Sequence, residues 1–404
     1  MLDRRSFVGS AALSSLLAWA FGSSRVSANT QDGKASPWSA AQPAASTSSN
    51  ITIEPMPNAD VAGRMDFHAG FLGWSLNDFE KKSSARLDEI FQERGIDPNT
   101  DVDLAPLLEN IRTDPLMAMR MRTWLSNQEL MLSGLHAAFA SESERFFDEL
   151  EAAEAKHPER IELNPGMAMP AYAKHEIHLQ KGGYVGNPLA GYVNYHYGNI
   201  LYEAMFGRNI QAERIAQMAA AVPVPDDGKV TRILDMGCAT GRLAFGLKNR
   251  FPGAKVTGID IGGPMVRYAH KRALDLDIEC TFAQRNAEAT RYPDNHFDII
   301  ASNILHHEVD ASATDNIIAE TFRILRPGGV FYPIDHATGK QKPKTTARTK
   351  LWAFNDRAIN NEVWRDEFEA RDFAQLIRNA GFNVDETGRP AVWGTGSIKA
   401  VKPA

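Results

Sequence analysis

The stretch Arg232-Ile-Leu-Asp-Met-Gly-Cys-Ala-Thr-Gly-Arg242 runs from an apolar segment through two glycines into a second apolar segment. Residues 230–236 have the aliphatic and β-branched content of a buried parallel strand, and residues 243–247 resume apolar spacing at a helical period. Gly237 and Gly241 allow backbone angles that are closed to other residues, and they let a ligand approach the N–H groups of a helix N-terminus. The stretch therefore predicts a strand, a tight turn and a helix that cradle a nucleotide-type cofactor.

The chain after this turn alternates between strand and helix patterns. We expect strands at 255–260, 278–285, 297–303 and 330–335, helices at 264–274 and 311–325, a turn at 326–329, and closing antiparallel strands within 382–402. Such alternation is typical of parallel βαβ units that form an open, twisted α/β sheet. Ligands of these sheets bind beyond the carboxyl ends of the strands, where the strand order reverses.

Four polar residues lie at or near the carboxyl ends of predicted strands: Asp235, Asp260, Asn286 and Asn303. Asp260 follows Asp235 by 25 residues and ends the second strand, where an acid can accept both hydroxyl protons of a ribose. That position alone would also suit a nicotinamide dinucleotide. The first turn lacks the Gly-x-Gly-x-x-Gly pattern of dinucleotide folds, however, and a carboxylate at Asp235 would repel a pyrophosphate but attract a cation. A positively charged cofactor is therefore expected.

Five motifs follow one another over about a hundred residues. They are Leu234-Asp-Met-Gly-Cys-Ala-Thr-Gly241, Gly258-Ile-Asp-Ile261, Asn286-Ala-Glu288, Phe297-Asp-Ile-Ile-Ala-Ser-Asn303 with Ile-Leu-His306-His307, and Leu325-Arg-Pro-Gly-Gly329. In order and spacing they resemble the motifs of a class I S-adenosylmethionine-dependent methyltransferase. The resemblance implies a Rossmann-like class I methyltransferase sheet with a helical N-terminal extension, and S-adenosyl-L-methionine as the cofactor.

The resemblance also implies which residues bind the cofactor. Asp235, Gly237, Cys238, Ala239 and Gly241 would hold its methionine part, Asp260 would bind the ribose, and Asn286 and Ala287 would meet the adenine. Asn303 would lie near the methionine or sulfonium end, and Ile261 is a further cofactor-binding candidate. Two residues depart from the family pattern. Ala239 stands where many members have a glycine, and Asn286 replaces a common acid but keeps an oxygen that can accept the adenine amino proton. No Asn-Pro-Pro-Tyr segment follows the fourth strand, which argues against methylation of nucleic-acid bases.

His306 and His307 follow the strand that would face the sulfonium, and they are the candidate catalytic residues. Methyl transfer is an in-line displacement, so the protein must align the nucleophile and remove its proton if it carries one. A histidine suits this role because its pKa lies near about 6.5. We favour His307, since one of the pair is expected to pack into the sheet rim. The alternative is that both are structural. His336 and tyrosines of the helical half would complete a pocket for the acceptor.

The first half of the chain shows mainly helical patterns. We expect a helical accessory or substrate-capping region over residues 51–220 and the S-adenosylmethionine-binding domain over residues 221–404. Helices are predicted at 76–94 and 114–139, and the second carries a stripe that is typical of a packed core: Met117, Met121, Trp124, Met131 and Leu135. The Glu-rich run 141–156 indicates a solvated helix face.

Residues 170–207 hold six of the nine tyrosines of the chain, and five of them lie within residues 184–202: Tyr184, Tyr192, Tyr195, Tyr197 and Tyr202. Such a cluster fits a surface that closes over a ligand and fits equally an aromatic seam between the two halves. His175 and His178 could share a helix face, but without a set of carboxylates they are better explained as hydrogen-bonded side chains than as a metal site. The basic run 340–350 is either a lid for an acidic substrate or a solvated loop.

The N-terminus carries Asp3-Arg4-Arg5-Ser6-Phe7 before a mildly apolar run that ends in small residues. This pattern resembles a twin-arginine export signal over residues 1–28, followed by a disordered linker rich in Ser, Ala, Thr and Pro over residues 29–50. An exported or periplasmic location follows if the signal is used, and a cytoplasmic location otherwise. No stable membrane insertion is expected, because the apolar run is shorter than the roughly 20 residues that a bilayer requires.

Composition narrows the partners further. The 404-residue chain is 43% hydrophobic and has a formal net charge of −6, which argues against a nucleic-acid surface and favours a small-molecule substrate. Its two cysteines, Cys238 and Cys280, have no metal-ligand spacing, so free thiols and no metal site are expected. We expect O- or C-methylation of a small organic acceptor. The alternatives are a non-catalytic binder of S-adenosylmethionine or S-adenosylhomocysteine and, third, an NAD-type oxidoreductase. The sequence leaves the oligomeric state open.

Overall fold

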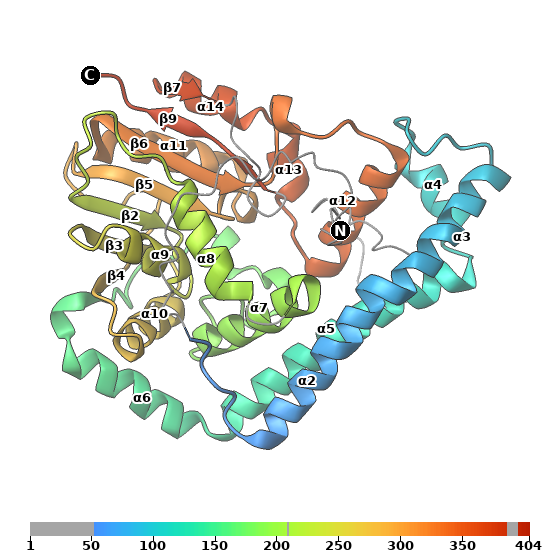
Figure 1. Cartoon of the computed structure of the whole chain (residues 1–404), viewed down its shortest axis with the longest axis horizontal. Helices are drawn as coiled ribbons and strands as arrows, with labels where there is room; N and C mark the ends of the chain where they lie inside the picture. The colour runs from blue at the N-terminus through green and yellow to red at the C-terminus, as the bar shows by residue number, and fades with distance from the viewer. Residues whose placement is uncertain (1–51, 208–209, 386–394) are drawn as a thin grey trace, which may run out of the picture.

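The computed structural model describes residues 52–207, 210–385 and 395–404. A sheet flanked by helices forms one part of the molecule, and a long helical arm extends from it (Figure 1). The predicted signal (1–28) and linker (29–50) lie outside the described residues. No helix in the described part of the chain is both long and apolar enough to cross a membrane.

A sheet of nine strands crosses the described part of the chain. The strands lie in the order β1 (Ile161–Glu162), β4 (Cys280–Gln284), β3 (Lys255–Asp260), β2 (Arg232–Met236), β5 (Phe297–Asn303), β6 (Leu325–Asp335), β9 (Lys399–Val401) and β7 (Asn383–Asp385), and β8 (Gly396–Ser397) also pairs with β6. All pairs from β1 to β6 are parallel, whereas the pairs that involve β8 and β9 are antiparallel. The strand order reverses between β2 and β5, so a crevice for a ligand is expected at the carboxyl ends of these strands.

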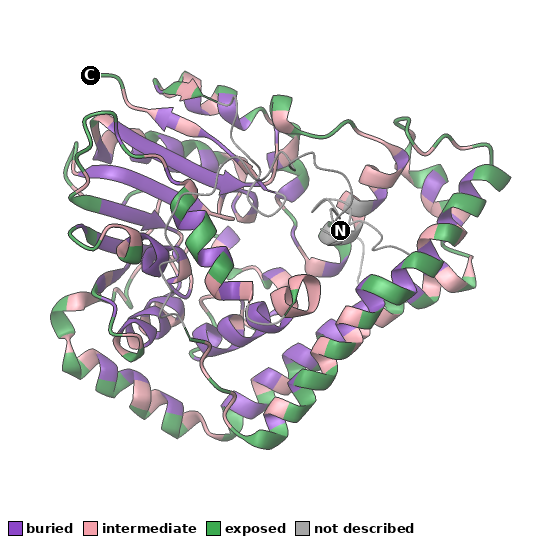
Figure 2. Ribbon diagram, viewed as in Figure 1, coloured by how far each residue is buried: buried purple, intermediate pink, exposed green. Residues whose placement is uncertain are grey.

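Helices cover both faces of the sheet because its central strands are apolar on both sides. Ile233 and Leu234, neighbours in β2, are both fully buried and belong to separate clusters on opposite faces. One face packs against α8 (Ile210–Ala221), α9 (Arg242–Arg250) and α10 (Gly263–Asp275), and the other against α11 (Ala311–Ile324), α13 (Arg365–Ala370) and α14 (Phe373–Asn379). Figure 2 shows the resulting buried layer of strands. The predicted α/β class, with a parallel-rich sheet and a helical N-terminal extension, is confirmed.

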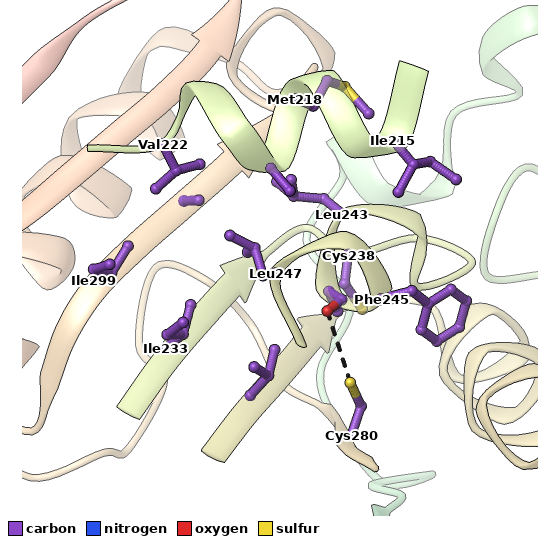
Figure 3. Packing of buried hydrophobic residues seen from close by; sticks show 14 of the residues in the cluster. Ile215, Met218, Val222, Ile233, Cys238, Leu243, Phe245, Leu247, Cys280 and Ile299 are labelled. Carbon is purple, nitrogen blue, oxygen red and sulfur yellow. Dashed lines mark hydrogen bonds between the residues drawn. The ribbon is translucent and has the colours of Figure 1, made fainter. Parts of the chain in front are cut away.

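α8 packs with the sheet, although the sequence prediction placed it in the accessory region 51–220. Ile215 and Met218 of α8 lie against Leu243 and Leu247 of α9 in one apolar cluster (Figure 3). The two helices approach so closely that a Cβ added at Gly246 would stand 2.8 Å from the side chain of Ile215. The domain boundary predicted between residues 220 and 221 would therefore place α8 in a different domain from the core that it covers.

The predicted strands agree closely with the observed ones. Strands expected at 255–260 and 297–303 coincide with β3 and β5, and the expected helix at 264–274 is α10 with one residue more at each end. The turn expected at 326–329 is a correction, since these residues lie within β6. Phe297 pairs with the residue before this segment and Ile299 with the residue after it, so the segment forms a bulge in the pairing with β5.

Asp298 holds this bulge in place. Its Oδ1 accepts a hydrogen bond from Nε of Arg326 at 2.6 Å. Its Oδ2 accepts hydrogen bonds at 2.8 Å from the backbone N–H groups of Thr231 and Arg232, and from the Thr231 hydroxyl. Burial alone would raise the pKa of Asp298, but these donors hold it below its usual value. One carboxylate thus ties the start of β2 to β5 and β6.

The arm consists of two antiparallel helical runs. α2 (Ala59–Trp74), the π-helical turn η2 (Ser75–Phe79) and α3 (Glu80–Glu93) follow one another without a break and pack along α5 (Pro115–Ser141), with α4 (Leu104–Ile111) at the far end (Figure 1). The helix predicted at 76–94 therefore begins earlier, after Asn58, whose side chain caps it by accepting a hydrogen bond from Val61 N at 3.0 Å. The Met and Trp stripe of α5 is buried core, as predicted.

α6 (Ser143–Lys156) has the predicted solvated face and a buried face as well. Its outer face is exposed, but Phe146, Leu150 and Ala153 are buried. The helix contacts α10, where Nε2 of His270 lies 3.0 Å from the Ala153 carbonyl oxygen and Arg267 pairs with Glu154. The Glu-rich composition indicated the exposed face correctly, but it drew attention away from three apolar residues that recur at helical spacing on the other face.

The basic run 340–350 leads into α12 (Ala347–Asn360), and two of its cations bind the arm. Arg348 pairs with Asp88 of α3, and Lys350 pairs with Asp101 at 2.5 Å. The backbone N–H of Ala347 also donates to the carbonyl oxygen of Thr100 at 2.7 Å. The run was expected to be a lid or a solvated loop, and in the structure it attaches the end of the arm to the sheet domain.

We predict that Asp298→Ala lowers the free energy of unfolding by about 2–4 kcal/mol, because it leaves several backbone donors and one guanidinium without their acceptor. Urea unfolding measures the change. The matched variant is Asp294→Ala, which removes an acid that is 71% exposed and pairs with Arg323 on the surface. It should cost less than about 1 kcal/mol. Equal effects of the two variants would contradict the role assigned to Asp298.

Candidate functional site

A cavity of about 320 Å³ opens at the carboxyl ends of β2, β3 and β5. One wall comes from the loops that follow these strands. The opposite wall comes from α5, from α7 (Ala190–Phe206), from the loop before α7 and from the segment between α12 and α13. The cavity therefore lies where the strand order reverses, between the sheet and the helical half of the chain.

The turn after β2 forms the floor of the cavity. Its residues Gly237, Ala239 and Gly241 all have positive φ, at 72°, 44° and 85°. A Cβ at Gly237 would stand 2.8 Å from the side chain of Leu305, so this position requires glycine for both conformation and space. Ala239, the departure from the family pattern, is held in place because its N–H donates to Oδ2 of Asp260 at 2.9 Å.

Two carboxylates line this side of the cavity, of which Asp235 is buried and Asp260 is partly buried. Asp235 is 1% exposed, and its Oδ2 accepts a hydrogen bond from Ala244 N at 2.9 Å. Burial raises the pKa of Asp235 to about 7, and the neighbouring Asp260 adds to the effect. Burial likewise raises the pKa of Asp260 to about 6, against hydrogen bonds from the N–H groups of Gly262 and Ala239. Among the described residues neither carboxylate has an ion-pair partner, so a cationic ligand in the cavity would favour their ionised forms.

The far end of this wall is made by Asn286, Ala287 and Ile261. Oδ1 of Asn286 accepts a hydrogen bond from Glu288 N at 2.9 Å, which fixes the loop after β4 and leaves this oxygen one further lone pair. Asn303 ends β5 beside the turn, and its Oδ1 is buried without a hydrogen-bond partner in the described part of the chain. A buried polar atom in that state at a cavity wall indicates a ligand contact.

The structure brings together all but one of the residues predicted to bind a cofactor. Asp235, Gly237, Cys238, Ala239, Asp260, Ile261, Asn286, Ala287 and Asn303 line the same cavity. Gly241 lies behind them at the start of α9, packed against Phe245. Its part is to shape the turn rather than to face the cavity. The assignment of these residues to parts of a cofactor stays a prediction.

The two candidate catalytic histidines have different environments. His306 is fully buried outside the cavity, with its ring centroid 4.6 Å from that of Phe373, and burial lowers its pKa to about 4. His307 lines the cavity, and its Nδ1 lies 2.6 Å from Oδ1 of Asp335. Burial lowers the pKa of His307, but the charge and hydrogen bond of Asp335 outweigh this and raise it to about 9.

His307 belongs to a polar cluster that the sequence did not reveal. The ring of His336, just after β6, lies 4.4 Å from that of His307 between centroids. Nε2 of His178 lies 3.1 Å from Glu308, and its Nδ1 lies 3.6 Å from Glu362. All five residues line the cavity. Because they come from four segments far apart in the chain, no local pattern could have found Glu362 or joined it to the histidines.

His175 and His178 do not share a helix face, which corrects the prediction. They lie in and beside short 3₁₀ turns, and His178 has φ of 53°. Both are hydrogen-bonded, as expected, His175 through Nε2 to the carbonyl oxygen of Asn361 at 2.9 Å. Left-handed backbone at His178 and again at Leu179 is strained, and such strain is typical of functional sites.

The tyrosine cluster is divided between a seam and the cavity. Tyr192 and Tyr195 of α7 are buried against Tyr268 of α10, with ring centroids 4.7 and 5.3 Å apart, and form a seam. Tyr184, Tyr197 and Tyr202 line the cavity. The helical period places successive tyrosines of α7 on different faces, so one helix serves the seam and the cavity.

Residues 233–329 match the family described as methyltransferase domain. The part of the chain that is similar to known methyltransferases therefore includes these residues. The match runs from β2 to the start of β6 and includes His307 and all the residues predicted to bind the cofactor. His178, His336 and Glu362 lie outside it, as do the helices that form the opposite wall.

Curated relatives are similar over the same part of the chain. The demethylmenaquinone methyltransferase of Thermus thermophilus is 34% identical over 124 residues, which cover 31% of this chain and 53% of the relative. The fatty-acid O-methyltransferase of Mycolicibacterium smegmatis is 31% identical over 137 residues, which cover 33% of this chain and 48% of the relative. This chain thus spans about half the length of these two relatives.

Solved structures of low similarity also match. One is the Haemonchus contortus phosphoethanolamine N-methyltransferase 2 in complex with phosphomonomethylethanolamine and S-adenosylhomocysteine. It has 17% sequence identity and a TM-score of 0.38 over 55% of this chain and 61% of that chain.

We predict that Gly237→Ala lowers the free energy of unfolding by about 1–3 kcal/mol, because it places a side chain at positive φ and against Leu305. Gly253→Ala is the matched variant, since its turn lies outside the positive-φ region and an added Cβ meets no atom within 4 Å. That change should stay within about 0.5 kcal/mol. Chemical denaturation of both proteins tests the difference, and a silent Gly237→Ala would show that the turn tolerates a side chain.

Proposed function

We propose that this protein transfers the methyl group of S-adenosyl-L-methionine to a small organic acceptor. The observation that carries the proposal is the coincidence of the methyltransferase-domain match with a cavity whose wall holds Asp235, which is buried, and Asp260, which is partly buried, both without an ion-pair partner among the described residues. The cofactor is a cation through its sulfonium, and it carries an ammonium group as well. The donor set of the wall therefore complements it in charge.

The residues of the wall fit the parts of the cofactor. Asp235 and the turn from Gly237 would hold the methionine part, where the ammonium group meets a carboxylate. Asp260 would accept from the ribose hydroxyls, because its two oxygens each bind only one N–H and keep further lone pairs. Asn303 would use its unpartnered Oδ1 near the sulfonium. When bound, the cofactor supplies a methyl group activated by the positive charge on sulfur.

The opposite wall would hold the acceptor and exclude water from it. Trp124, Leu201, Met205 and Trp364 give this side an apolar surface, and His307 reaches the same space as a polar group from the loop after β5. Since Nδ1 of His307 is engaged by Asp335, Nε2 is the ring atom left to meet an acceptor. With a pKa raised to about 9, this imidazole is protonated near neutral pH, so its Nε2–H would stabilise the anionic form of an acceptor that carries an acidic hydroxyl, such as a phenol, an enol or an acid. O- or C-methylation is therefore favoured over N- or S-methylation.

The second candidate is a binder of S-adenosylmethionine or S-adenosylhomocysteine without activity. The observation in its favour is the Arg4-Arg5 pattern, from which we propose that the protein is exported. The cofactor is made in the cytosol, so an exported protein would lack the supply of cofactor that an enzyme needs. Fractionation of cells that express the wild type or Arg4→Lys, Arg5→Lys tests export. Transfer to the periplasm of the wild type alone supports it, and the same cytosolic location of both refutes it.

Methyl transfer is tested with cofactor that carries a labelled methyl group, incubated with the protein and a small-molecule extract. With the wild type we expect label to move to an extractable product. With Asp260→Ala we expect at least about 100-fold less labelled product. The control is a variant on the surface, Asp294→Ala. If label never leaves the cofactor although the protein binds it, the chain is a binder and not an enzyme.

Calorimetry separates the cofactor classes. We expect S-adenosylmethionine and S-adenosylhomocysteine to bind, NAD not to bind, and Asp260→Ala to weaken both binding reactions by at least about tenfold, because the ribose loses a charged acceptor. Asp294→Ala should bind like the wild type. Tight binding of NAD alone would refute the proposal and support an oxidoreductase.

The affinity for S-adenosylmethionine should decrease as the pH is lowered. Burial raises the pKa of Asp235 to about 7 and that of Asp260 to about 6. Below these values the carboxylates carry protons that the cationic ligand must displace. The dissociation constant should therefore rise as the pH falls from about 8 to about 5.5, by up to about tenfold per pH unit for each protonated group. Asp235→Asn should remove the upper part of this dependence. An affinity that is flat with pH in the wild type would contradict it.

A further inference from the structure

Three metal-ligating side chains converge at the acceptor end of the cavity. One ligand atom each of His307, His336 and Glu362 lies within 4.8 Å of the other two. We propose that these three residues bind a divalent first-row metal ion, with Zn²⁺ as the reference, and that the ion receives an oxygen atom of the acceptor. The binding site stands on its own geometry, and the role for the acceptor rests on the proposed function.

The ligand set matches the chemistry of catalytic zinc sites. Two imidazoles and one carboxylate are the protein ligands of one common class of such sites, which leave a fourth position open. Ligand atoms around a tetrahedral zinc ion with bonds of about 2.1 Å lie about 3.4 Å apart, so these atoms would close by roughly 1 Å on binding. All three residues line the cavity, so the open position would face the space for the acceptor.

Neighbouring groups already orient the ligands. Oδ1 of Asp335 engages Nδ1 of His307 at 2.6 Å, which presents Nε2 to the ion in the carboxylate–histidine arrangement of many metal sites. Asp335 is itself fixed by the backbone N–H groups of residues 305, 306 and 336, at 2.7 to 3.1 Å. Glu362 is held by Arg365 at 3.1 Å and faces His178 at 3.6 Å.

The charge of the surroundings favours a dication. Three carboxylates face the three histidines, those of Glu308, Asp335 and Glu362. One guanidinium, that of Arg365, pairs with one of them, Glu362. With neutral imidazoles the carboxylates outnumber the cation, and a divalent ion would offset the excess in a buried site where screening by water is weak.

The ion would select the class of acceptor. A hydroxyl oxygen at the open position forms a bond to the metal and loses its proton to solvent, because a bound divalent ion lowers the pKa of an oxygen ligand. The anion that results is the nucleophile. Phenols, enols and hydroxy acids would be accepted, whereas amines and thioethers without a neighbouring hydroxyl would not use the ion.

Metal binding is measured on the full chain, purified without a histidine tag, stripped with a chelator and titrated with Zn²⁺ against a chromophoric competitor. We expect one equivalent per chain, and a loss of affinity of at least about 100-fold in His336→Gln and in Glu362→Gln. His336→Cys, which keeps a zinc ligand, should recover most of the affinity. His157→Gln is the matched control, because it removes an imidazole that pairs with Glu159 away from the cavity.

The outcomes separate the ion from the reaction. Calorimetry with S-adenosylhomocysteine shows whether each variant is folded, and a variant that keeps this ligand while it loses Zn²⁺ supports the site. The proposal is overturned if the stripped chain takes up no Zn²⁺, or if His336→Gln, Glu362→Gln and His157→Gln bind it alike. If Zn²⁺ binds at the site and no methyl transfer is found, the proposed function fails and the site stands. If transfer to a phenol is equal with and without Zn²⁺, the role for the acceptor is overturned.

Discussion

The parallel pairing of β2 with β3 on one side and β5 on the other is the constraint on which the cavity depends. Asp235 pairs in register with Gly258 and with Ala301, so the three strands end at one level. Their loops then leave toward the same space. Because β2 is the strand at which the order turns back, helices depart from its two sides to opposite faces and leave the rim uncovered. The polar groups at these strand ends can meet only there.

Most of the sheet could be predicted from the sequence, because each strand and helix of that part carries its own local signal. The apolar runs before Asp260 and Asn303 are bounded by polar residues, and the structure ends the strands at those residues. The bulge in β6 could not be predicted in the same way. Its Pro-Gly-Gly composition is typical of a turn, and it enters the strand only because the carboxylate of Asp298 is placed opposite by a different strand.

The candidate site shows the same difference between residues with a local sequence signal and residues placed by tertiary contacts. The residues predicted to bind the cofactor lie next to strand ends, so the order of motifs brought together residues that line one cavity. The acceptor wall depends on tertiary contacts: Glu362 follows α12, and His178 precedes α7 in a loop with left-handed backbone. Neither residue belongs to a local pattern. His306 and His307 show the limit most clearly, since adjacent histidines of one short turn face an apolar core and a polar cavity respectively.

The ion pairs between α12 and the arm give the molecule a sensitivity to its medium. Asp88 and Asp101 are more than half exposed, so dissolved salt screens their attraction to Arg348 and Lys350, with a Debye length of about 8 Å at physiological ionic strength. α12 ends two residues before Glu362. These ion pairs thus connect the far end of the arm to α12, the helix that leads to the proposed acceptor wall. We therefore expect a change in ionic strength to affect that wall through α12 and not through the residues predicted to bind the cofactor.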